Sequence, residues 1–216
     1  MTYAPSHAER LVVVLAALAA LTPSAHAAIA IPVSPVRANP ADRLLSERIE
    51  ASYYESASRC RPRVKRPGTE AFIAWLQANA DGVYWGSYRC EKWGLGSASL
   101  HAEKRAVDWH LNAGTAEGQR EAQRIVVLLT APDASGNLQA LARRMGVEEI
   151  IWDCAYWSAG MAAFRPYAPC YDRRGKSRKK VNLTVAHRDH IHFGLTRAGA
   201  RGATTFWRLW AQTHRP

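Results

Sequence analysis

The sequence predicts an α+β fold with a small, mainly antiparallel sheet and flanking helices. Short segments with strand-like alternation lie between amphipathic segments of helical periodicity. They lack the regular strand–helix–strand order of a parallel sheet, which favours a mixed antiparallel architecture. With 48% hydrophobic and 22% charged residues, the composition is that of a globular protein with a hydrophobic core.

The N-terminal residues 1–27 have the features of a secretory signal peptide. Arg10 precedes an apolar run from Leu11 to Leu21, and Ala25-His26-Ala27 has the small-x-small pattern of a cleavage site after Ala27. The run is shorter than the roughly 20 residues that span a bilayer, although an uncut anchor is the alternative. We therefore expect a secreted protein, extracellular or associated with the cell wall, with no membrane attachment after cleavage.

Three further segments follow the predicted signal peptide. Residues 28–40 are rich in proline and predict a linker. Residues 41–58 predict a helical preamble, with Asp42 as its N-cap and Ile49 and Tyr53 on its apolar face. The remaining residues, 59–216, are expected to form the functional domain.

Within this domain, periodicity, capping residues and Gly or Pro breaks define the expected elements. Helices are predicted at 70–80, 117–131, 137–145 and 204–212. Strands are predicted at 83–88, 106–111, 147–152 and 189–195, and a long loop at 164–180. Because strand side chains alternate, Asp108 and His110 share one face of their strand, as His190 and His192 do in theirs.

The four cysteines contain no C-x-x-C pair, so a cysteine zinc site is not expected. An even number of cysteines in an exported chain indicates two disulfides. Three pairings are possible. The shortest loops favour Cys60 with Cys90 and Cys154 with Cys170.

The formal net charge of +11 favours an anionic partner. Export argues against a nucleic acid, so an acidic polymer of the cell envelope is the simpler expectation. The alternative is that the charge only maintains solubility. Six of the eight residues 173–180 are basic, and a solvated loop is the ordinary interpretation of such a run.

Two short runs, 99–108 and 187–192, are dense in histidines and carboxylates. His101, Asp108 and His192 would supply two imidazoles and one carboxylate, the ligand set of a zinc site that leaves a fourth position for water. Asp189, three residues before His192, is placed to act as a general base. His110 and His187 are better explained as structural groups or as hydrogen-bond partners of the ligands.

The pattern Ser-x-His-x-x-x-x-Ala-x-Asp at 99–108, followed by acid-x-x-His at 189–192, resembles a group of zinc peptidases. The group contains D-alanyl-D-alanine carboxypeptidases and dipeptidases, certain phage endolysins and relatives with a hedgehog-like fold. Tyr88-Arg89-Cys90 and the segments 149–153 and 156–158 are similar to a secreted actinobacterial branch of it. The resemblance covers about residues 69–196.

The resemblance implies a hedgehog-like peptidase fold with Zn²⁺ bound by His101, Asp108 and His192. It implies Asp189 as the catalytic base. His190 is the alternative base, because some relatives end in His-x-His.

Further positions follow from the same resemblance. Arg89 would stabilise the developing oxyanion, and Ser99 would contact substrate. Trp152 and Trp157 either line a sugar- or peptide-binding cleft or belong to the core. Lys104 stands where the family usually has Gly, and Lys fits there only if the backbone needs neither a positive φ nor a close approach.

We therefore expect a monomeric, secreted zinc peptidase that hydrolyses stem or cross-link peptides of peptidoglycan, with no nucleic-acid partner. The alternative is a non-catalytic wall-binding protein with a structural or vestigial metal site. A zinc nuclease is disfavoured, because such enzymes commonly use paired metals with more carboxylates.

Overall fold

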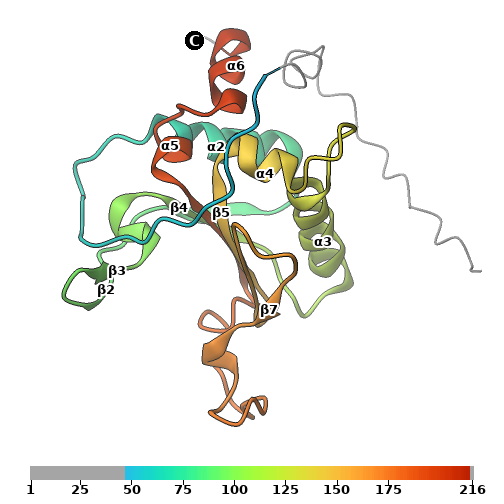
Figure 1. The fold of residues 1–216 in the computed structure, drawn as a ribbon. Coiled ribbons are helices and arrows are strands. Elements are labelled where there is room, and N and C mark those ends of the chain that lie inside the picture. Colours follow the sequence, from blue (N-terminus) through green and yellow to red (C-terminus); the bar gives the residue numbers. More distant parts are fainter. Residues whose placement is uncertain (1–46, 215–216) are drawn as a thin grey trace, which may run out of the picture. The chain divides into compact units, whose positions relative to one another are not determined.

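The computed structural model describes residues 47–214, so the predicted signal peptide (1–27) and linker (28–40) lie outside the described residues. The described part is an α+β structure built on a six-stranded antiparallel sheet, as expected (Figure 1). The sheet order is β1-β4-β8-β5-β6-β7. Its strands are β1 Val83–Gly86, β4 Ala106–His110, β5 Val147–Trp152, β6 Ala155–Ser158, β7 Arg165–Pro166 and β8 His190–Leu195.

A second, two-stranded sheet pairs β2 Lys92–Gly94 with β3 Ser97–Ala98. The helices are α2 Pro67–Asn79, α3 Ala116–Thr130, α4 Ala140–Met145, α5 Arg197–Ala200 and α6 Thr205–Thr213. Two short 3₁₀ turns are η1 Leu100–Glu103 and η2 Ala168–Cys170. None of the helices among residues 47–214 has the length and hydropathy needed to cross a membrane.

One face of the sheet is covered by helices and forms the main core. Val107 and Trp109 of β4 and Ile191 and Phe193 of β8 point into it and pack against α2, whose Phe72 ring meets Phe193 edge to face at 5.3 Å. Because strand side chains alternate, the residues between them point to the opposite face. That face therefore carries Asp108 and His192.

The predicted helices and strands are found with small shifts at their ends. Helix α2 begins at Pro67, three residues before the predicted start at Glu70, and a proline suits the first helical position because it has no N–H group. The helix α4 begins at Ala140 instead of residue 137, after Gln139 in a left-handed conformation. Strand β6 was not predicted, since its four residues show no distinctive alternation.

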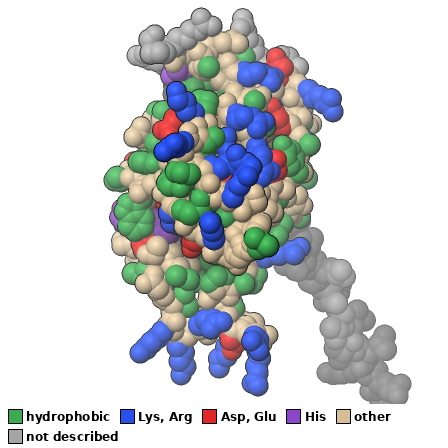
Figure 2. All heavy atoms as spheres, turned by 90° about the vertical axis from the view of Figure 1, so that its left-hand side faces the viewer, with side chains coloured by type: hydrophobic (Ala, Val, Ile, Leu, Met, Phe, Trp, Pro, Cys, Tyr) green, Lys and Arg blue, Asp and Glu red, His purple; other side chains and the backbone are tan. Residues whose placement is uncertain are grey.

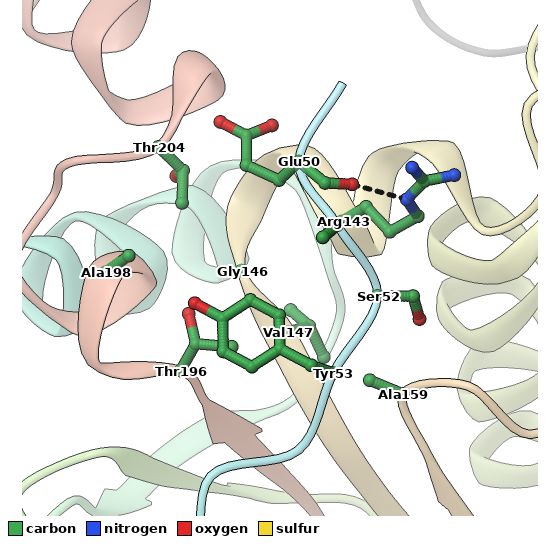
Figure 3. Close-up of a pocket in the computed structure, with 11 residues that line it drawn as sticks. Glu50, Ser52, Tyr53, Arg143, Gly146, Val147, Ala159, Thr196, Ala198 and Thr204 are labelled. Atoms are coloured by element: carbon green, nitrogen blue, oxygen red, sulfur yellow. Dashed lines mark hydrogen bonds between the residues drawn. The ribbon is translucent and has the colours of Figure 1, made fainter. Parts of the chain in front are cut away.

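The predicted helical preamble is wrong in its described part. Residues 48–56 have no helix, and we call residues 47–58 the strap because they run extended over the body. The strap's polar groups bond to the body: the Glu50 carboxylate accepts from Thr205, and the Glu50 carbonyl accepts from Arg143 Nε at 2.6 Å (Figure 3). These long-range contacts override the local helical periodicity.

Figure 3 also shows a small cavity beneath the strap, lined in part by Glu50, Tyr53, Arg143 and Thr204. Its volume of about 20 Å³ suits one water molecule. Thr204 Oγ1 is buried and has no hydrogen-bond partner among the described residues, so a water there would satisfy it. The cavity is too small for an organic substrate.

A buried ionic network ties the strap to the sheet. The guanidinium of Arg105, fully buried, contacts the Glu148 carboxylate at 2.7 Å and the Glu103 carboxylate at 3.1 Å. It also donates to the Glu55 carbonyl at 2.6 Å, while the Glu55 N–H donates to Glu148. The Glu55 carboxylate accepts from Arg197.

Two disulfides join Cys60 to Cys90 and Cys154 to Cys170, which confirms the expected pairing. They are compatible with an extracellular location.

Candidate metal centre

His101, Asp108 and His192 converge on one point. His101 Nε2 lies 3.0 Å from Asp108 Oδ1 and 3.1 Å from His192 Nδ1, and His192 Nδ1 lies 3.0 Å from the same Asp108 oxygen. All three residues are buried. The predicted ligand set is therefore brought together as a compact triad, although the ligands are remote in sequence.

The sheet register explains how Asp108 and His192 meet. Asp108 on β4 pairs directly with His192 on β8, and directly opposed residues of an antiparallel ladder share a face. His101 comes from η1, the turn before β4. Ser99 caps that turn by accepting a hydrogen bond from the His101 N–H at 3.3 Å. Ser99 is buried, so its predicted contact with substrate is not supported.

Lys104 ends η1 in a left-handed conformation with φ of +53°. The expectation that a Lys here excludes a positive φ is therefore wrong. The turn needs the conformation that Gly adopts without cost, and Lys adopts it at a cost. Its ammonium lies 5.6 Å from the centre of the Tyr88 ring, and its carbonyl accepts from Thr69 Oγ1 at 2.9 Å. These contacts help to hold the turn.

Glu149 lies behind His192 and was assigned no role from the sequence. Its Oε1 lies 3.1 Å from His192 Nε2, the ring nitrogen opposite the triad. A carboxylate in this position fixes the ring and leaves Nδ1 free to bind a cation. Gly194 makes room for it, because a Cβ at Gly194 would overlap Leu100 of η1 and lie 2.9 Å from Glu149 Cβ. Two glutamates in the otherwise apolar strand 147–152 were the available signal.

Asp189 and His190 form a hydrogen-bonded pair beside the triad. Asp189 Oδ1 accepts from His190 Nδ1 at 2.7 Å, and Asp189 Oδ2 accepts from Thr184 Oγ1 at 2.6 Å. His190 Nε2 is buried without a hydrogen-bond partner among residues 47–214 and lies 3.6 Å from Asp108 Oδ1. The imidazole of His190, and not the Asp189 carboxylate, therefore presents its free atom to the triad.

Arg89 lies at the triad, as expected, but its bonds are to carboxylates. Nη1 donates to Asp108 Oδ2, and Nε donates to Glu91 at 3.2 Å. The Arg89 side chain is half-exposed, and Nη2 makes no hydrogen bond to a described residue. Arg89 thus orients the outer oxygen of Asp108 and keeps one amino group available to a ligand.

The prediction that Trp152 and Trp157 line a binding cleft is wrong. Both indoles belong to the main core, and their N–H groups donate to Gln119 and to the Met161 carbonyl. An exposed aromatic side chain next to the site is instead Trp85 of β1.

Trp85 lies 5.5 Å from the His190 ring and 5.2 Å from that of His110. The pair His110–His190 is opposed across β4 and β8, so the indole covers the end of the same sheet face. His187, on the other side, packs against His190 and His192 with ring separations of 4.6 and 5.7 Å. As expected, His110 and His187 are neighbours of the triad and do not belong to it.

The electrostatics of the site favour a bound cation. Burial opposes ionisation of Asp108, but hydrogen bonds with His101 and His192 outweigh it and hold the pKa of Asp108 well below its ordinary value. Burial lowers the pKa of His101. Burial also lowers the pKa of His187, to about 3, assisted by His192 and His190. Burial also opposes protonation of His192, but hydrogen bonds with Asp108 and Glu149 outweigh it and raise the pKa of His192 to about 9. A divalent metal that binds at Asp108 and the two imidazoles would therefore have to displace a proton from His192.

The donor geometry agrees with a tetrahedral metal. Three ligand atoms about 2.0–2.1 Å from zinc lie a little over 3 Å from one another, close to the separations in the triad. His101 Nε2 and His192 Nδ1 face each other and the same oxygen, so a cation would accept all three lone pairs at once. The triad is thus a candidate metal centre, and its metal is a matter for measurement.

No protein-family model matches this chain, and neither a curated protein nor a solved structure matches it. The fold and the site therefore define an α+β protein with a candidate His₂Asp metal centre, and any closer assignment rests on the motifs and the geometry.

Proposed function

We propose that this protein is a secreted zinc-dependent peptidase that hydrolyses stem or cross-link peptides of peptidoglycan. The observation that carries the proposal is the compact His101–Asp108–His192 triad with the Asp189–His190 pair directly beside it. Two features support a hydrolytic metal over a purely structural one. They are the spacing of these residues along the chain and the imidazole of His190, which is polarised by Asp189.

When bound, zinc would polarise a scissile carbonyl and lower the pKa of a water molecule toward ~7. The protein's own groups would then move the proton. His190 takes it up at Nε2, since this atom is free and lies on the side of the triad. Asp189 holds the Nδ1 proton of His190, so it selects the tautomer and stabilises the imidazolium. This division of roles differs from Asp189 acting alone.

Arg89 and Trp85 are the groups available to a substrate. Nη2 of Arg89 would bind the oxygen that gains negative charge, while Nη1 keeps Asp108 oriented. The exposed indole of Trp85 offers an apolar wall next to His190 for a peptide or sugar ring.

The experiment is digestion of purified peptidoglycan by the protein as isolated, after chelation, and after zinc is restored, with chromatography of the released muropeptides. Products should form only with metal. His101→Ala should lose both metal and activity, whereas His190→Gln should keep the metal and lose about 10²–10⁴-fold in kcat. His110→Gln is the matched control, since His110 lies on the same sheet face but outside the triad.

Four outcomes would contradict the proposal at different steps. Unchanged peptidoglycan at every metal tested would refute catalysis, and binding without products would favour the wall-binding alternative. Full activity of His190→Gln would show that another group takes the proton. Loss of activity in Asp189→Asn with an active His190→Gln would return the role of base to Asp189.

A further inference from the structure

Residues 171–181 form a hairpin that projects from the end of the sheet beyond β7, and we call it the basic hairpin (Figure 1). Tyr171 and Ser177 make an isolated antiparallel bridge. Asp172 shapes the tip: its Oδ1 accepts from the N–H groups of Arg174 and Lys176, both at 2.9 Å. The Asp172 N–H donates to the Lys176 carbonyl at 2.9 Å. The hairpin is thus a formed structure.

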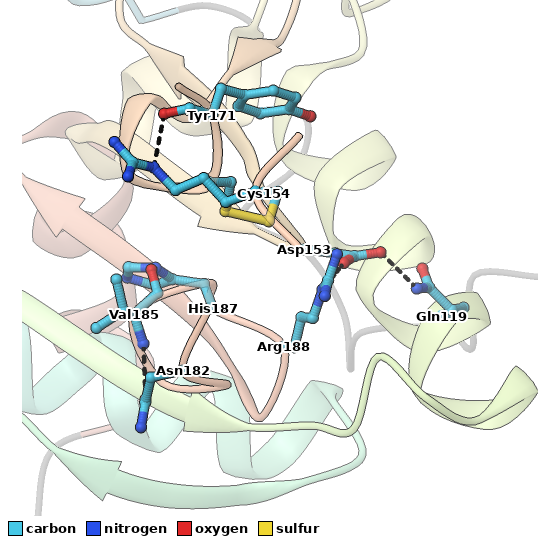
Figure 4. Close-up of a disulfide and its surroundings, with 10 residues drawn as sticks. Gln119, Asp153, Cys154, Tyr171, Asn182, Val185, His187 and Arg188 are labelled. Carbon is cyan, nitrogen blue, oxygen red and sulfur yellow. Dashed lines mark hydrogen bonds and ion pairs between the residues drawn. A yellow bond between two sulfur atoms is a disulfide. The ribbon is translucent and has the colours of Figure 1, made fainter. Parts of the chain in front are cut away.

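The base of the basic hairpin is joined to the segment that leads to the candidate metal centre. Cys170 is bonded to Cys154 and packs with it around buried Ala186 (Figure 4). The next residue, His187, packs against the rings of Tyr167 and His192. The base of the basic hairpin is therefore anchored on the segment that leads to Asp189 and His190.

The basic hairpin carries a large excess of positive charge. Residues 172–180 are all exposed. The six cations are Arg173, Arg174, Lys176, Arg178, Lys179 and Lys180. None of them makes an ion pair with a residue of the described part. Figure 2 shows the Lys and Arg side chains spread around this end of the molecule. Mutual repulsion of these groups is relieved by binding anions.

The residue types that are missing from residues 172–180 indicate which kind of anion would bind there. This stretch has no aromatic residue, and the one aromatic residue of the hairpin, Tyr171, is partly buried at its base. Stacking on several exposed aromatic rings is how proteins hold unpaired bases. The same stretch has no aliphatic side chain beyond the stems of Lys and Arg, and the nearest exposed aliphatic side chains, Leu183 and Val185, follow the hairpin. The cations themselves therefore lack the apolar face of a segment that inserts into a lipid surface. Three arginines offer forked donors that match phosphate oxygens. These features fit a flexible chain of phosphodiester groups without bases.

We propose that the basic hairpin is a docking site for a linear, base-free phosphodiester polymer of the cell envelope. The polymer lies across the hairpin and holds the protein against the material to which the polymer is attached. This inference rests on the secretion included in the proposed function, but it does not depend on the peptidase activity, because the hairpin contains none of the metal ligands or the Asp189–His190 pair.

The test is binding of the full chain to fluorescently labelled poly(glycerol phosphate), measured by anisotropy over a range of salt concentrations. A hairpin variant carries Arg173→Gln, Lys176→Gln and Lys179→Gln. A matched control carries Arg63→Gln, Lys65→Gln and Lys92→Gln, which remove the same charge from exposed positions elsewhere. We expect the hairpin variant to lose about tenfold or more in affinity, and the control less than about twofold.

Thermal unfolding should be unchanged in both variants, since all six positions are exposed. Chelated protein should bind the polymer as well as metal-loaded protein does, which separates this proposal from the peptidase proposal. Equal losses in the two variants would refute a specific hairpin site. Equal binding of poly-glutamate would refute the choice of phosphate, and tighter binding of duplex DNA or anionic vesicles would assign another partner.

Discussion

Single residues at the candidate metal centre adopt states that their types do not favour. Lys104 takes a left-handed backbone, and Glu149 is a carboxylate in a buried strand. In each case a partner compensates: Tyr88 and Thr69 contact Lys104, and His192 contacts Glu149. Such residues are expected where geometry at a site outweighs local preference.

Replacing Lys104 with Gly tests the cost of the left-handed turn. Lys104→Gly should be more stable than Lys104→Ala by about 1 kcal/mol in urea unfolding, because only Gly adopts this φ without strain. The Ala variant is the control, since it removes the same contact with Tyr88. Equal stabilities would mean that the turn relaxes without its positive φ.

Glu149→Gln tests the support behind His192. The amide retains a hydrogen-bonding oxygen but loses the charge, so we expect zinc affinity to fall about 10–100-fold in competition with a chelator. Glu117→Gln, at an exposed position of α3, is the control. Unchanged affinity would show that the His192 ring is held by packing alone.

At the scale of elements, two arrangements matter: the register of β4 against β8, which builds the site, and the strap over the body, which closes a buried ionic network. The register places Asp108 opposite His192, while η1 brings in His101. The strap closes the ionic network around Arg105, in which Glu55, Glu103 and Glu148 face the guanidinium groups of Arg105 and Arg197. Because three carboxyl groups face only two guanidinium groups, we expect one of the carboxyl groups to keep its proton.

Glu148 is the group that we expect to hold this proton. Burial raises the pKa of Glu148 to about 7, and Glu55 adds to the effect, although Arg105 opposes it. The folded state thus binds the proton more tightly than the unfolded state, whose pKa is the ordinary 4.5. This contribution to stability is complete below pH 4.5 and is lost as the pH rises through 7.

Between pH 4.5 and pH 7, the free energy of unfolding of the wild type should therefore fall by up to about 3 kcal/mol more than that of Glu148→Gln. The size follows because one pKa unit corresponds to about 1.4 kcal/mol. Urea titrations at several pH values measure the difference in slope. Glu70→Gln, exposed on α2, should follow the wild type. If the stability of Glu148→Gln changed with pH in the same way as that of the wild type, the proton would be held by a group other than Glu148.

At the scale of the whole molecule, a metal would join segments that are otherwise held by the sheet and the disulfides. His101 and His192 are separated by 91 positions, and only folding brings them together. A metal that binds the folded chain and not the unfolded one adds stability in proportion to the logarithm of its free concentration.

Removing the metal should accordingly lower the thermal midpoint. At a free zinc concentration about 100 times the dissociation constant, we expect a midpoint roughly 5–10 °C above that of chelated protein. Asp108→Asn should abolish the difference, because a neutral amide replaces the carboxylate of the triad. A calorimetric scan with and without chelator is sufficient. Identical midpoints in the wild type would contradict a metal bound by the folded chain.

Local patterns in the sequence predicted most of the elements, both disulfides and the three members of the triad. Alternation placed Asp108 with His110 and His192 with His190, on the strand faces opposite the core, and the shortest loops between cysteines indicated the pairing. These features depend on neighbours along the chain or on loop closure, and both can be read from spacing.

The remaining features were decided by the tertiary structure alone. They depend on which groups, distant in the sequence, compete for the same partners. Residues 48–56 have helical periodicity but form no helix, because Glu50 and Glu55 make long-range hydrogen bonds with the body. Trp152 and Trp157 entered the core, since β5 and β6 present them to the helices. Likewise, Asp189 lies against Thr184 and His190, so the free nitrogen near the triad belongs to His190. A sequence lists the charges and rings, whereas desolvation and hydrogen-bond geometry, set only when the chain is folded, select their partners.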